Sequence, residues 1–527
     1  MLRNSRTITL PAALTVAVGL LVAACGGQSA AERAGCKTIA AHAATGQTAT
    51  PAGVWPYSNG DLANTRDATG STISKANVSR LAQAWTFKLT GKAAVGVRPY
   101  GALTANPIVQ NGVVYIQDLD SDVFALALAT GKLEWEYQCS QPEKSGPGPN
   151  GVAVANGKLY GLTPTAAFAL NAATGQTTWV DSDLLGKGQG TFGIQPQVAN
   201  GRVYLASQYG SGPGGGVLLA LNASSGGVLW RFNTVVGPEP GVQSLGLGAG
   251  GAWETPLVSN DGSVSYGIGN PYQSASAAIA HPAVGLYTDS VVNLGAATGK
   301  LRWYYQGVPN DFKDYDMQAS PISARVDGAS VVLGSGKMGY VYEMNAATGE
   351  LMWKTPVGEH SGHDEDSLHA LEHRSTLRAP FTITPGPLGG VLTDLAVAGG
   401  TVYVATLDVP VTYTNLDVPA PTKAAGSTTG EVEALSLATG KVEWDRKVSQ
   451  LPLGAVTVSN DLVLTTLYDG VLVGLDRSTG VIVYRHQLPT STNSPIAIAG
   501  DTVIVPAGGP VTSTGGGNPQ VAAYTLR

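Results

Sequence analysis

A short pattern that ends in tryptophan or tyrosine returns seven times along this chain of 527 residues. Each copy has a Gly-containing turn, usually Ala-Thr-Gly, and a short apolar run before the aromatic residue. Gly supplies the positive φ of a hairpin turn, and the flanking Val, Leu, Tyr and Phe favour strands, so each copy predicts a β-hairpin. Hairpins repeated at intervals of roughly 40 to 90 residues predict an array of sheets. The copies occupy residues 128–135, 171–179, 222–230, 295–303, 345–353, 436–444 and 476–484.

An eighth unit is divided between the two ends of the repeat region. Trp85 ends a strand that has no Ala-Thr-Gly turn before it, and residues 520–527 read as a strand with no such turn after it. Pairing these two strands would complete one unit and cover two open sheet edges. The sequence therefore predicts an all-β fold, an eight-bladed β-propeller of four-stranded antiparallel blades. Its tryptophans would dock between neighbouring blades, and its N- and C-terminal strands would close it.

Composition agrees with many tight turns and argues against a nucleic-acid partner. The chain has 69 Gly, only 13% charged residues and a formal net charge of −6. Long solvated helices need more charge than this, and a nucleic-acid surface needs a basic patch. We therefore expect a protein that binds no nucleic acid.

The first 24 residues have the features of an export signal. Arg3 and Arg6 precede an apolar run over residues 10–22, which is too short for an ordinary membrane span. The segment Leu-Val-Ala-Ala-Cys at 21–25 resembles the bacterial lipoprotein signal, which implies cleavage before Cys25 and lipid on its sulfur. An ordinary secretory signal with a chance cysteine is the alternative. The predicted division is a signal peptide over 1–24, a lipid-anchored flexible tether over 25–52 and a propeller over 53–527. Such a protein would be extracytoplasmic and lipid-anchored to the bacterial cell membrane.

Two further cysteines, Cys36 and Cys139, remain after the leader. Outside the cytoplasm they could pair and tie the N-terminal segment to the body. Two free thiols are the alternative, and the sequence does not decide between them.

Several segments beyond the repeat carry a more specific pattern. The opening Trp-Pro-Tyr-Ser-Asn-Gly over 55–60, continued to residue 85, looks like the start of the PQQ-dependent alcohol dehydrogenases, a quinoprotein family. Its central blades are similar to Gly-Ile-Gly-Asn-Pro over 267–271 and to residues 301–311 and 336–340. The resemblance covers nearly the whole chain after the leader. It implies an eight-bladed propeller in which the cofactor is stacked over the axis.

The resemblance also assigns roles to individual residues. Asn270 and Asp314 match metal ligands, and Asp314 also matches the general base. Asp316 matches an extra carboxylate of lanthanide-type members, although some calcium-type members carry it too. Lys337 matches the basic residue that bonds the quinone oxygens, and Trp253 matches the indole on which the quinone stacks. Equivalent positions of neighbouring blades converge on the axis, so these side chains could meet in one funnel. A solvated loop is the alternative for the Asp311, Asp314 and Asp316 cluster.

These matches imply PQQ with calcium or a lanthanide as cofactors and an alcohol-type small molecule as substrate. In the resembled chemistry a carboxylate removes the hydroxyl proton and the quinone takes up the hydride. No Cys-x-x-Cys-His haem motif occurs in the chain. We therefore expect a separate extracytoplasmic protein to accept the electrons.

Other positions depart from the family. Ser211 stands where a glutamate ligand is usual, and Asn150 replaces an arginine that pairs with a cofactor carboxylate. Val391-Leu392 replaces Asn-Trp, Lys313 replaces a tryptophan, and residues 104–107 lack the first-blade glutamate. The vicinal cysteine pair is also missing. These losses favour an alternative, a non-catalytic propeller lipoprotein that serves as a protein-binding or assembly scaffold. Such a protein would resemble the propeller lipoprotein of outer-membrane assembly machinery.

A second group of candidate ligands lies in residues 358–373, which hold four of the seven histidines. Mixed His and carboxylate ligands suit zinc or another transition metal. A polar inter-blade loop is one alternative, and an insertion that covers the funnel mouth and takes part in substrate access is another. The candidates are His360, His363, Asp364, Asp366, His369 and His373.

Overall fold

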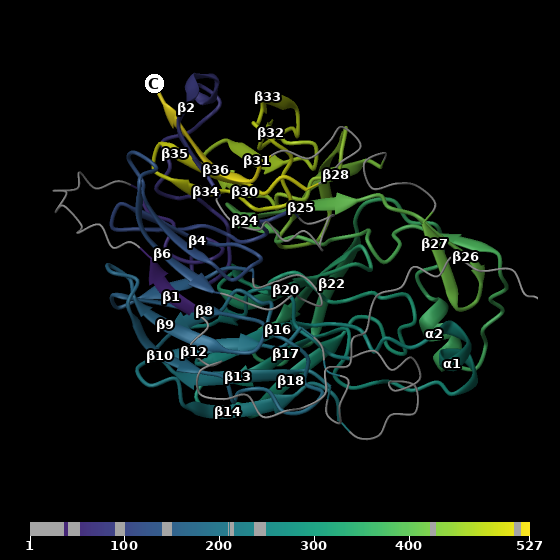
Figure 1. Ribbon diagram of the computed structural model, residues 1–527. Helices are drawn as coiled ribbons and strands as arrows, with labels where there is room; N and C mark the ends of the chain where they lie inside the picture. The colour runs from purple at the N-terminus through teal and green to yellow at the C-terminus, as the bar shows by residue number, and fades with distance from the viewer. Residues whose placement is uncertain are drawn as a thin grey trace, which may run out of the picture.

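The computed structural model describes residues 36–39, 53–89, 101–139, 150–208, 210, 215–236, 249–421, 428–510 and 518–527. In Figure 1 successive sheets follow one another around a common centre, as in a β-propeller. The predicted leader, Cys25, Ser211 and the predicted tether apart from residues 36–39 lie outside the described residues. No helix within the described part is long and apolar enough to cross a membrane.

The described residues form nine sheets, of which eight have four or more strands and are numbered here in chain order. Sheet one contains β1 (Cys36–Ile39), β3 (Ile108–Gln110), β4 (Val113–Gln117), β5 (Val123–Ala127) and β6 (Leu133–Cys139); sheet two β7 (Ala153–Ala155), β8 (Lys158–Leu162), β9 (Ala167–Asn171) and β10 (Thr177–Asp181); sheet three β11 (Gln197–Ala199), β12 (Arg202–Ala206), β13 (Val217–Asn222) and β14 (Val228–Asn233); sheet four β15 (Leu257–Val258), β16 (Ser263–Ile268), β17 (Ser290–Gly295) and β18 (Leu301–Gln306).

Sheet five contains β19 (Ile322–Val326), β20 (Ala329–Ser335), β21 (Tyr340–Asn345) and β22 (Leu351–Pro356); sheet six β24 (Ala396–Ala398), β25 (Thr401–Leu407), β28 (Gly430–Ser436) and β29 (Val442–Val448); sheet seven β30 (Thr457–Ser459), β31 (Leu462–Thr466), β32 (Val471–Asp476) and β33 (Ile482–Gln487); sheet eight β34 (Ala497–Ala499), β35 (Thr502–Ala507), β36 (Gln520–Leu526) and β2 (Leu81–Lys88). The prediction of four-stranded antiparallel sheets is confirmed for seven of these eight, and β1 adds a fifth strand to sheet one.

The repeated tryptophan joins seven of the eight sheets to the next one, as predicted, while the copy in sheet seven ends in Tyr484. Its indole N–H donates to a backbone carbonyl oxygen at the turn of the following sheet, and its ring packs on the turn glycine. At one such turn Gly299 has φ +65°, and a methyl group there would lie 2.7 Å from the Trp230 ring. The bonds run from Trp85 to Leu128 (2.7 Å), Trp135 to Ala172 (3.0 Å), Trp179 to Ala223 (3.1 Å), Trp230 to Ala296 (3.0 Å), Trp303 to Ala346 (2.9 Å), Trp353 to Leu437 (3.0 Å) and Trp444 to Arg477 (3.0 Å).

Two strands from opposite ends of the chain pair in sheet eight. β2 runs antiparallel to β36, from Leu81 opposite Leu526 to Lys88 opposite Gln520. This is the pairing that the sequence predicts for the incomplete eighth unit. It joins β2 to the last strand of the chain, and the two strands lie side by side in Figure 1.

The two cysteines left open by the sequence form a disulfide. Strand β1 pairs antiparallel with β6 at the outer edge of sheet one, with Cys36 opposite Cys139, and their sulfurs are bonded. Residues 36–39 belong to the predicted flexible tether, and that prediction does not hold for these four residues. The free-thiol alternative is excluded.

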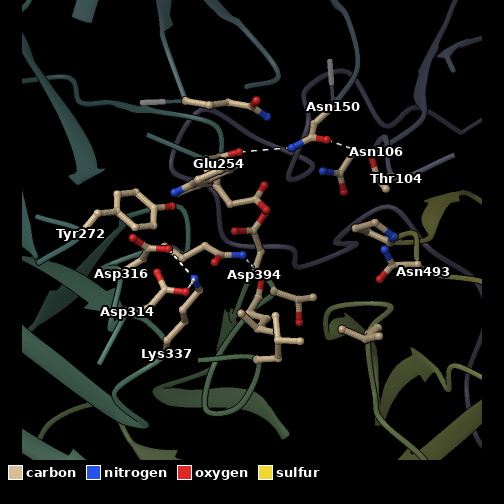
Figure 2. Close-up of a pocket in the computed structure, with 18 residues that line it drawn as sticks. Thr104, Asn106, Asn150, Glu254, Tyr272, Asp314, Asp316, Lys337, Asp394 and Asn493 are labelled. Atoms are coloured by element: carbon tan, nitrogen blue, oxygen red, sulfur yellow. Dashed lines mark hydrogen bonds and ion pairs between the residues drawn. The ribbon is translucent and has the colours of Figure 1, made fainter. Parts of the chain in front are cut away.

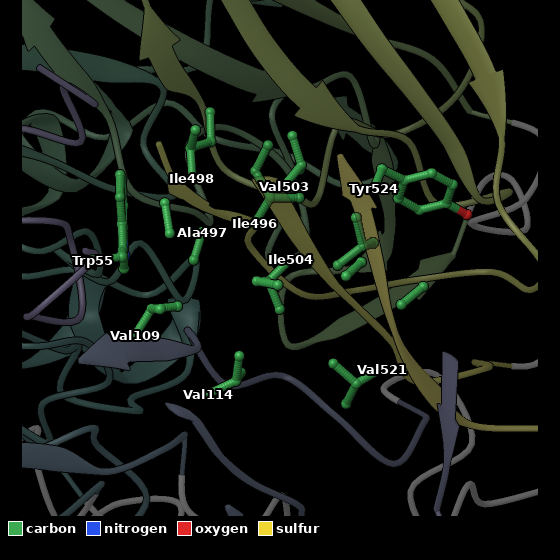
Figure 3. Packing of buried hydrophobic residues seen from close by; sticks show 14 of the residues in the cluster. Trp55, Val109, Val114, Ile496, Ala497, Ile498, Val503, Ile504, Val521 and Tyr524 are labelled. Atoms are coloured by element: carbon green, nitrogen blue, oxygen red, sulfur yellow. The ribbon is translucent and has the colours of Figure 1, made fainter. Parts of the chain in front are cut away.

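The segment over residues 55–68 packs between sheets that are far apart in the sequence. Trp55 is 1% exposed and pairs with Val109 through two backbone hydrogen bonds of 2.9 and 2.8 Å. Figure 3 shows its ring beside Val109, Ala497 and Ile498, within an apolar cluster shared by sheets one and eight. Burial of this indole fixes the start of the segment.

A wholly buried arginine fixes the end of the same segment. The guanidinium of Arg66 donates to five oxygens at 2.8 to 2.9 Å, and every one of them is uncharged. Burial lowers the pKa of Arg66 to about 10, and the nearby Asp394 and Glu254 oppose that shift. The acceptors are Val456 O, Asn59 Oδ1, Asn106 Oδ1, Thr457 Oγ1 and Ile496 O.

A small insertion lies to one side of the sheets. The three-stranded sheet of β23 (Phe381–Ile383), β26 (Val411–Asn415) and β27 (Val418–Pro421) lies near α1 (Ala275–Ala280) and α2 (Asp366–Leu371), as Figure 1 shows. Asp417, in the turn between β26 and β27, accepts hydrogen bonds from the backbone and the hydroxyl of Ser276 at 2.8 and 2.6 Å. The insertion and α1 are therefore tied together.

Candidate functional site

The acidic loop over residues 310–316 is held by its own side chains. Asp311 is buried, and its carboxylate oxygens accept the backbone N–H groups of Lys313 and Tyr315, each at 2.9 Å. Between these two bonds Asp314 has φ +63°, a left-handed conformation that non-glycine residues seldom adopt. Asp311 is therefore the internal brace of the loop, and the loop turns the Asp314 side chain toward Asn270.

Four of the predicted site residues meet at the end of β16 and the start of the following sheet. The backbone and side-chain N–H groups of Asn270 both donate to Asp316 Oδ1 at 2.8 Å, and Asn270 Nδ2 also donates to Asp314. Lys337 Nζ lies 3.1 Å from Asp314 Oδ2 and 2.6 Å from Asp316 Oδ2. Figure 2 shows Asp314, Asp316 and Lys337 together on one side of a cavity. The predicted convergence of these side chains is present in the structure.

Burial and ion pairing act in opposite directions on these charges. Burial raises the pKa of the Asp314 carboxyl above its usual value, while the Lys337 ammonium lowers it and Asp316 raises it further. Burial alone would lower the pKa of Lys337, but Asp314 and Asp316 raise it well above its ordinary value. The lysine therefore stays charged, and Asp314 accepts a proton more readily than an exposed carboxylate does.

The cluster opens into a cavity of about 310 Å³ that is lined by residues from several of the sheets. Trp253 forms part of its wall, and the indole N–H has no hydrogen-bond partner. Gln208 is 1% exposed, also lines the cavity, and leaves both polar atoms of its amide without a partner. Buried polar atoms are nearly always satisfied, so these groups indicate that the cavity accepts a polar ligand.

The far side of the cavity carries uncharged polar groups. Thr104 donates to Asn150 at 2.8 Å, and Asn150 donates to the backbone oxygen of Trp253 at 3.2 Å. Asn106 and Asn493 line the same region, as Figure 2 shows. Of the described residues that line the cavity, Lys337 is the only cation. Leu392, from the Val391-Leu392 departure, is an apolar part of the lining.

Two carboxyl groups in the cavity wall were not predicted from the sequence. In Figure 2 Glu254 and Asp394 face one another near the middle of the cavity. Burial raises the pKa of Glu254 well above its usual value, Asp394 raises it further, and Arg66 behind them lowers it. Glu254 follows Trp253 directly, but no pattern in the sequence brings Asp394 next to it.

The residues present fit a quinone and a hard metal ion at one end of the cavity. Asp314 and Asp316 offer carboxylate oxygen atoms, the ligands that calcium-type ions prefer. Asn270 faces them with its Nδ2, while its Oδ1 accepts the backbone N–H of Tyr272 at 2.6 Å, so its amide would have to turn to act as a metal ligand. The Trp253 indole offers a flat apolar face, and the Lys337 ammonium is a hydrogen-bond donor. At the other end, cofactor carboxylates would meet amide and hydroxyl groups in place of an arginine.

The histidine-rich segment does not gather its candidate ligands at one point. His360 Nδ1 pairs with Asp364 at 2.9 Å, and His363 Nδ1 pairs with Asp366 at 2.9 Å. Asp366 also receives the buried ammonium of Lys313 at 3.1 Å. The possible metal-ligand groups within the described residues include none of these histidines, nor His369 or His373. The segment holds α2 against the acidic loop.

Comparison with known proteins agrees with the geometry. A family model described as "Glucose/ethanol/alcohol dehydrogenase, beta-propeller domain" matches residues 55–155 and 187–366, more than half of the chain. A second model, "Outer membrane protein assembly factor BamB", matches residues 337–518.

Individual relatives are longer than this chain. The quinohemoprotein alcohol dehydrogenase of Comamonas testosteroni is 26% identical over 506 residues, covering 83% of this chain and 69% of the relative. The quinohemoprotein alcohol dehydrogenase ADH-IIG of Pseudomonas putida is 31% identical over 316 residues, covering 53% and 42%. The chain thus spans about two fifths of the second relative's length. A solved structure of the Pseudomonas putida HK5 enzyme ADHIIG matches with a TM-score of 0.77 at 21% identity, covering 90% of this chain and 80% of that one.

Proposed function

The chain belongs to the glucose, ethanol and alcohol dehydrogenase β-propeller family, and from that premise we propose that it is a quinoprotein oxidoreductase. It would oxidise an alcohol-type small molecule with PQQ and a bound calcium or lanthanide ion. The observation that carries this proposal is the meeting of Asn270, Asp314, Asp316 and Lys337, of which the last three line one cavity together with Trp253.

Each of these side chains has a part in the proposed reaction. Asp314 removes the proton of the substrate hydroxyl, because its carboxylate lines the cavity and its raised pKa favours proton uptake. Lys337 keeps Asp314 and Asp316 in place through its two ion pairs. Trp253 supplies the flat wall against which a planar ligand packs. PQQ supplies two-electron acceptance when bound, and the metal ion supplies Lewis acidity.

The finer architecture and the cellular setting are part of the same proposal. The eight larger sheets are the blades of one ring, which the pairing of β2 with β36 closes. The leader over residues 1–24 and lipid on Cys25 hold the protein at the outer side of the bacterial cell membrane. A separate extracytoplasmic protein takes the electrons.

A second candidate function is a non-catalytic scaffold that binds other proteins. The match of residues 337–518 to the outer membrane assembly factor supports it. The cavity also supports it, because Lys337 is the only described cation in the lining and is already engaged by two carboxylates. A trianionic quinone would bind more weakly there than in a site with an arginine.

One experiment separates the two functions. Purified protein is mixed with PQQ and either calcium or a lanthanide, and quinone absorbance is measured after gel filtration, followed by dye reduction with a panel of alcohols. The enzyme proposal predicts retained quinone and turnover. Asp314→Ala should abolish turnover, whereas Asp261→Ala, which removes an exposed carboxylate paired with Arg302, should not. Absence of both quinone and turnover would leave the scaffold function.

A further inference from the structure

A second group of carboxylates lies between sheets five and six, outside the cavity. On β28, Glu431 and Glu433 point to one face of sheet six, and their partners on β29 are Lys447 and Asp445. Directly opposed residues of an antiparallel pair share a face, so these four side chains lie together. Asp408 follows β25 on the same side, and Glu359 approaches from the end of β22 in sheet five.

The oxygen atoms of this group are close enough to share one ion. One ligand oxygen each from Glu359, Asp408 and Glu431 lies within 4.8 Å of the other two, and the same is true of Glu431, Glu433 and Asp445. Asp408, Glu431 and Glu433 are 4 to 6% exposed. Five carboxyl groups therefore crowd one interface, three of them nearly removed from water.

The positive charge beside them is smaller than the negative charge. Lys447 Nζ lies 2.6 Å from Glu359 Oε1 and 3.2 Å from Glu431 Oε1, but the lysine side chain is 62% exposed. Arg446, the next residue, donates its Nε to Gly480 O. The Lys447 ammonium thus lies in an exposed position between two of the carboxylates, where a divalent cation could displace it.

An unsatisfied hydroxyl points independently to a missing ligand. Thr406 is wholly buried on β25 directly opposite Glu431, and its Oγ1 has no hydrogen-bond partner. A methyl group built on Gly358 would meet Thr406 Oγ1 at 3.0 Å and Asp408 Oδ1 at 3.5 Å, so both oxygens border the same small space. A buried hydroxyl without a partner is costly unless something else binds it.

We propose that Glu359, Asp408, Glu431 and the hydroxyl of Thr406 bind a calcium ion that joins sheets five and six. The ligands are all hard oxygens from carboxylate and hydroxyl groups, which suit calcium. None is a histidine or cysteine, so zinc is disfavoured. The ion lies apart from the proposed catalytic cavity and does not depend on the function proposed for it.

The test measures calcium binding to the full purified chain by calorimetry, with magnesium and zinc as separate arms. The Asp314→Ala variant serves as the parent protein, so that calcium at the cavity does not interfere. We expect one calcium binding event that Glu431→Gln weakens by about tenfold or more, because one charged ligand is lost. Asp261→Asn, which neutralises an exposed carboxylate of another ion pair, should leave it unchanged. Calcium binding that survives Glu431→Gln at full affinity would overturn the proposal, as would tighter binding of zinc.

Two further variants give readouts that a purely structural cluster would not produce. Lys447→Gln removes the competing ammonium and should tighten calcium binding, whereas loss of a structural ion pair alone would leave calcium affinity unchanged. Thr406→Val removes the unpartnered hydroxyl and should raise the melting temperature without calcium, yet reduce the rise that calcium produces. The Thr406→Val variant also tests the site if Glu431→Gln fails to fold. An undiminished calcium-induced rise in Thr406→Val would refute the assignment.

Discussion

Replacing Lys313 with methionine tests how the acidic loop is fastened to the insertion. The Lys313 side chain is wholly buried, and its Nζ lies 3.1 Å from Asp366 Oδ2, which belongs to the first turn of α2. The same ammonium donates to the backbone oxygen of His363. Burial lowers the pKa of Lys313, and Asp366 opposes that shift. The pair thus connects the loop that carries Asp314 with a helix that begins 53 positions after Lys313.

The magnitude follows from distance and burial. At 3.1 Å and an effective dielectric constant of about 20, Coulomb attraction is about 5 kcal/mol, before the cost of removing both charges from water. Removing one partner of a buried pair typically costs about 3 to 5 kcal/mol, since the other charge is left uncompensated. We expect Lys313→Met to lower the free energy of unfolding by about 3 kcal/mol. The double variant Lys313→Met/Asp366→Asn should cost about 1 kcal/mol, since no buried charge remains alone.

Denaturant unfolding followed by tryptophan fluorescence measures these differences for both single variants and the double variant. The matched control is Arg302→Met, which breaks an exposed pair of similar length, 2.9 Å to Asp261, and should cost less than about 1 kcal/mol. If the double variant loses as much stability as the sum of the two single variants, the two charges are not coupled and the reasoning fails.

Three more perturbations test other parts of the fold. Gly349→Ala should lower stability by about 2 to 4 kcal/mol, because Gly349 has φ +74° and the new methyl would lie 2.6 Å from Trp303. Gly328→Ala should lower stability by only about 1 kcal/mol, because Gly328 has φ +84° but open space around it. Equal losses of stability in the melting curves of the two variants would contradict the role of the indole contact. Arg66→Met should cost more than about 4 kcal/mol by denaturant unfolding, since five buried oxygens lose their donor; a loss below about 1 kcal/mol would mean that water replaces the guanidinium. Burial raises the pKa of Glu343 from 4.5 to about 7, so its contribution to stability is present below pH 4.5 and declines as pH rises toward 7, by up to about 3 kcal/mol. Glu343→Gln should therefore raise the melting temperature more at pH 8 than at pH 5, and a gain independent of pH would count against this assignment.

The repeat made the sheets and their connections predictable. A turn glycine and a tryptophan at fixed spacing define a hairpin locally, and the indole needs an acceptor on the neighbouring sheet. The pairing of β2 with β36 follows from the same local logic, because each end of the repeat lacks the half that the other supplies. The meeting of Asn270, Asp314 and Lys337 was predictable because equivalent positions of neighbouring sheets point to the same centre.

Contacts that depend on insertions were not predictable in this way. In the sequence, Lys313 is a lysine where the resembled family usually has a tryptophan. Only the structure shows that Asp366 of α2 pairs with its charge. The histidines near it clustered in sequence, but His360 and His363 each pair with a nearby carboxylate. Proximity along the chain therefore suggested a shared metal that the backbone geometry does not support.

The carboxylates between sheets five and six are the opposite case, because they lie together in the structure although they are far apart along the chain. Glu359 and Glu431 are 72 positions apart, and no pattern in the sequence relates one to the other. Strand register places Glu431 beside Asp408 and Lys447 within sheet six, but Glu359 reaches them from the loop after β22, and the sequence does not show how two neighbouring sheets approach one another. The same reason explains why Arg66 could not be recognised as a central buried cation.

The bond between Cys36 and Cys139 determines how the fold would carry mechanical tension. A pull applied to the chain ahead of residue 36 passes through the sulfur atoms directly into β6. Residues 37–138, including Trp55, Arg66 and β2, then lie within a covalent ring outside that path of force. Under reducing conditions the same pull would peel β1 from β6 and act on the chain that leads to β2 and its pairing with β36. An oxidising environment thus shields from traction the N-terminal segment whose strand β2 completes the last sheet.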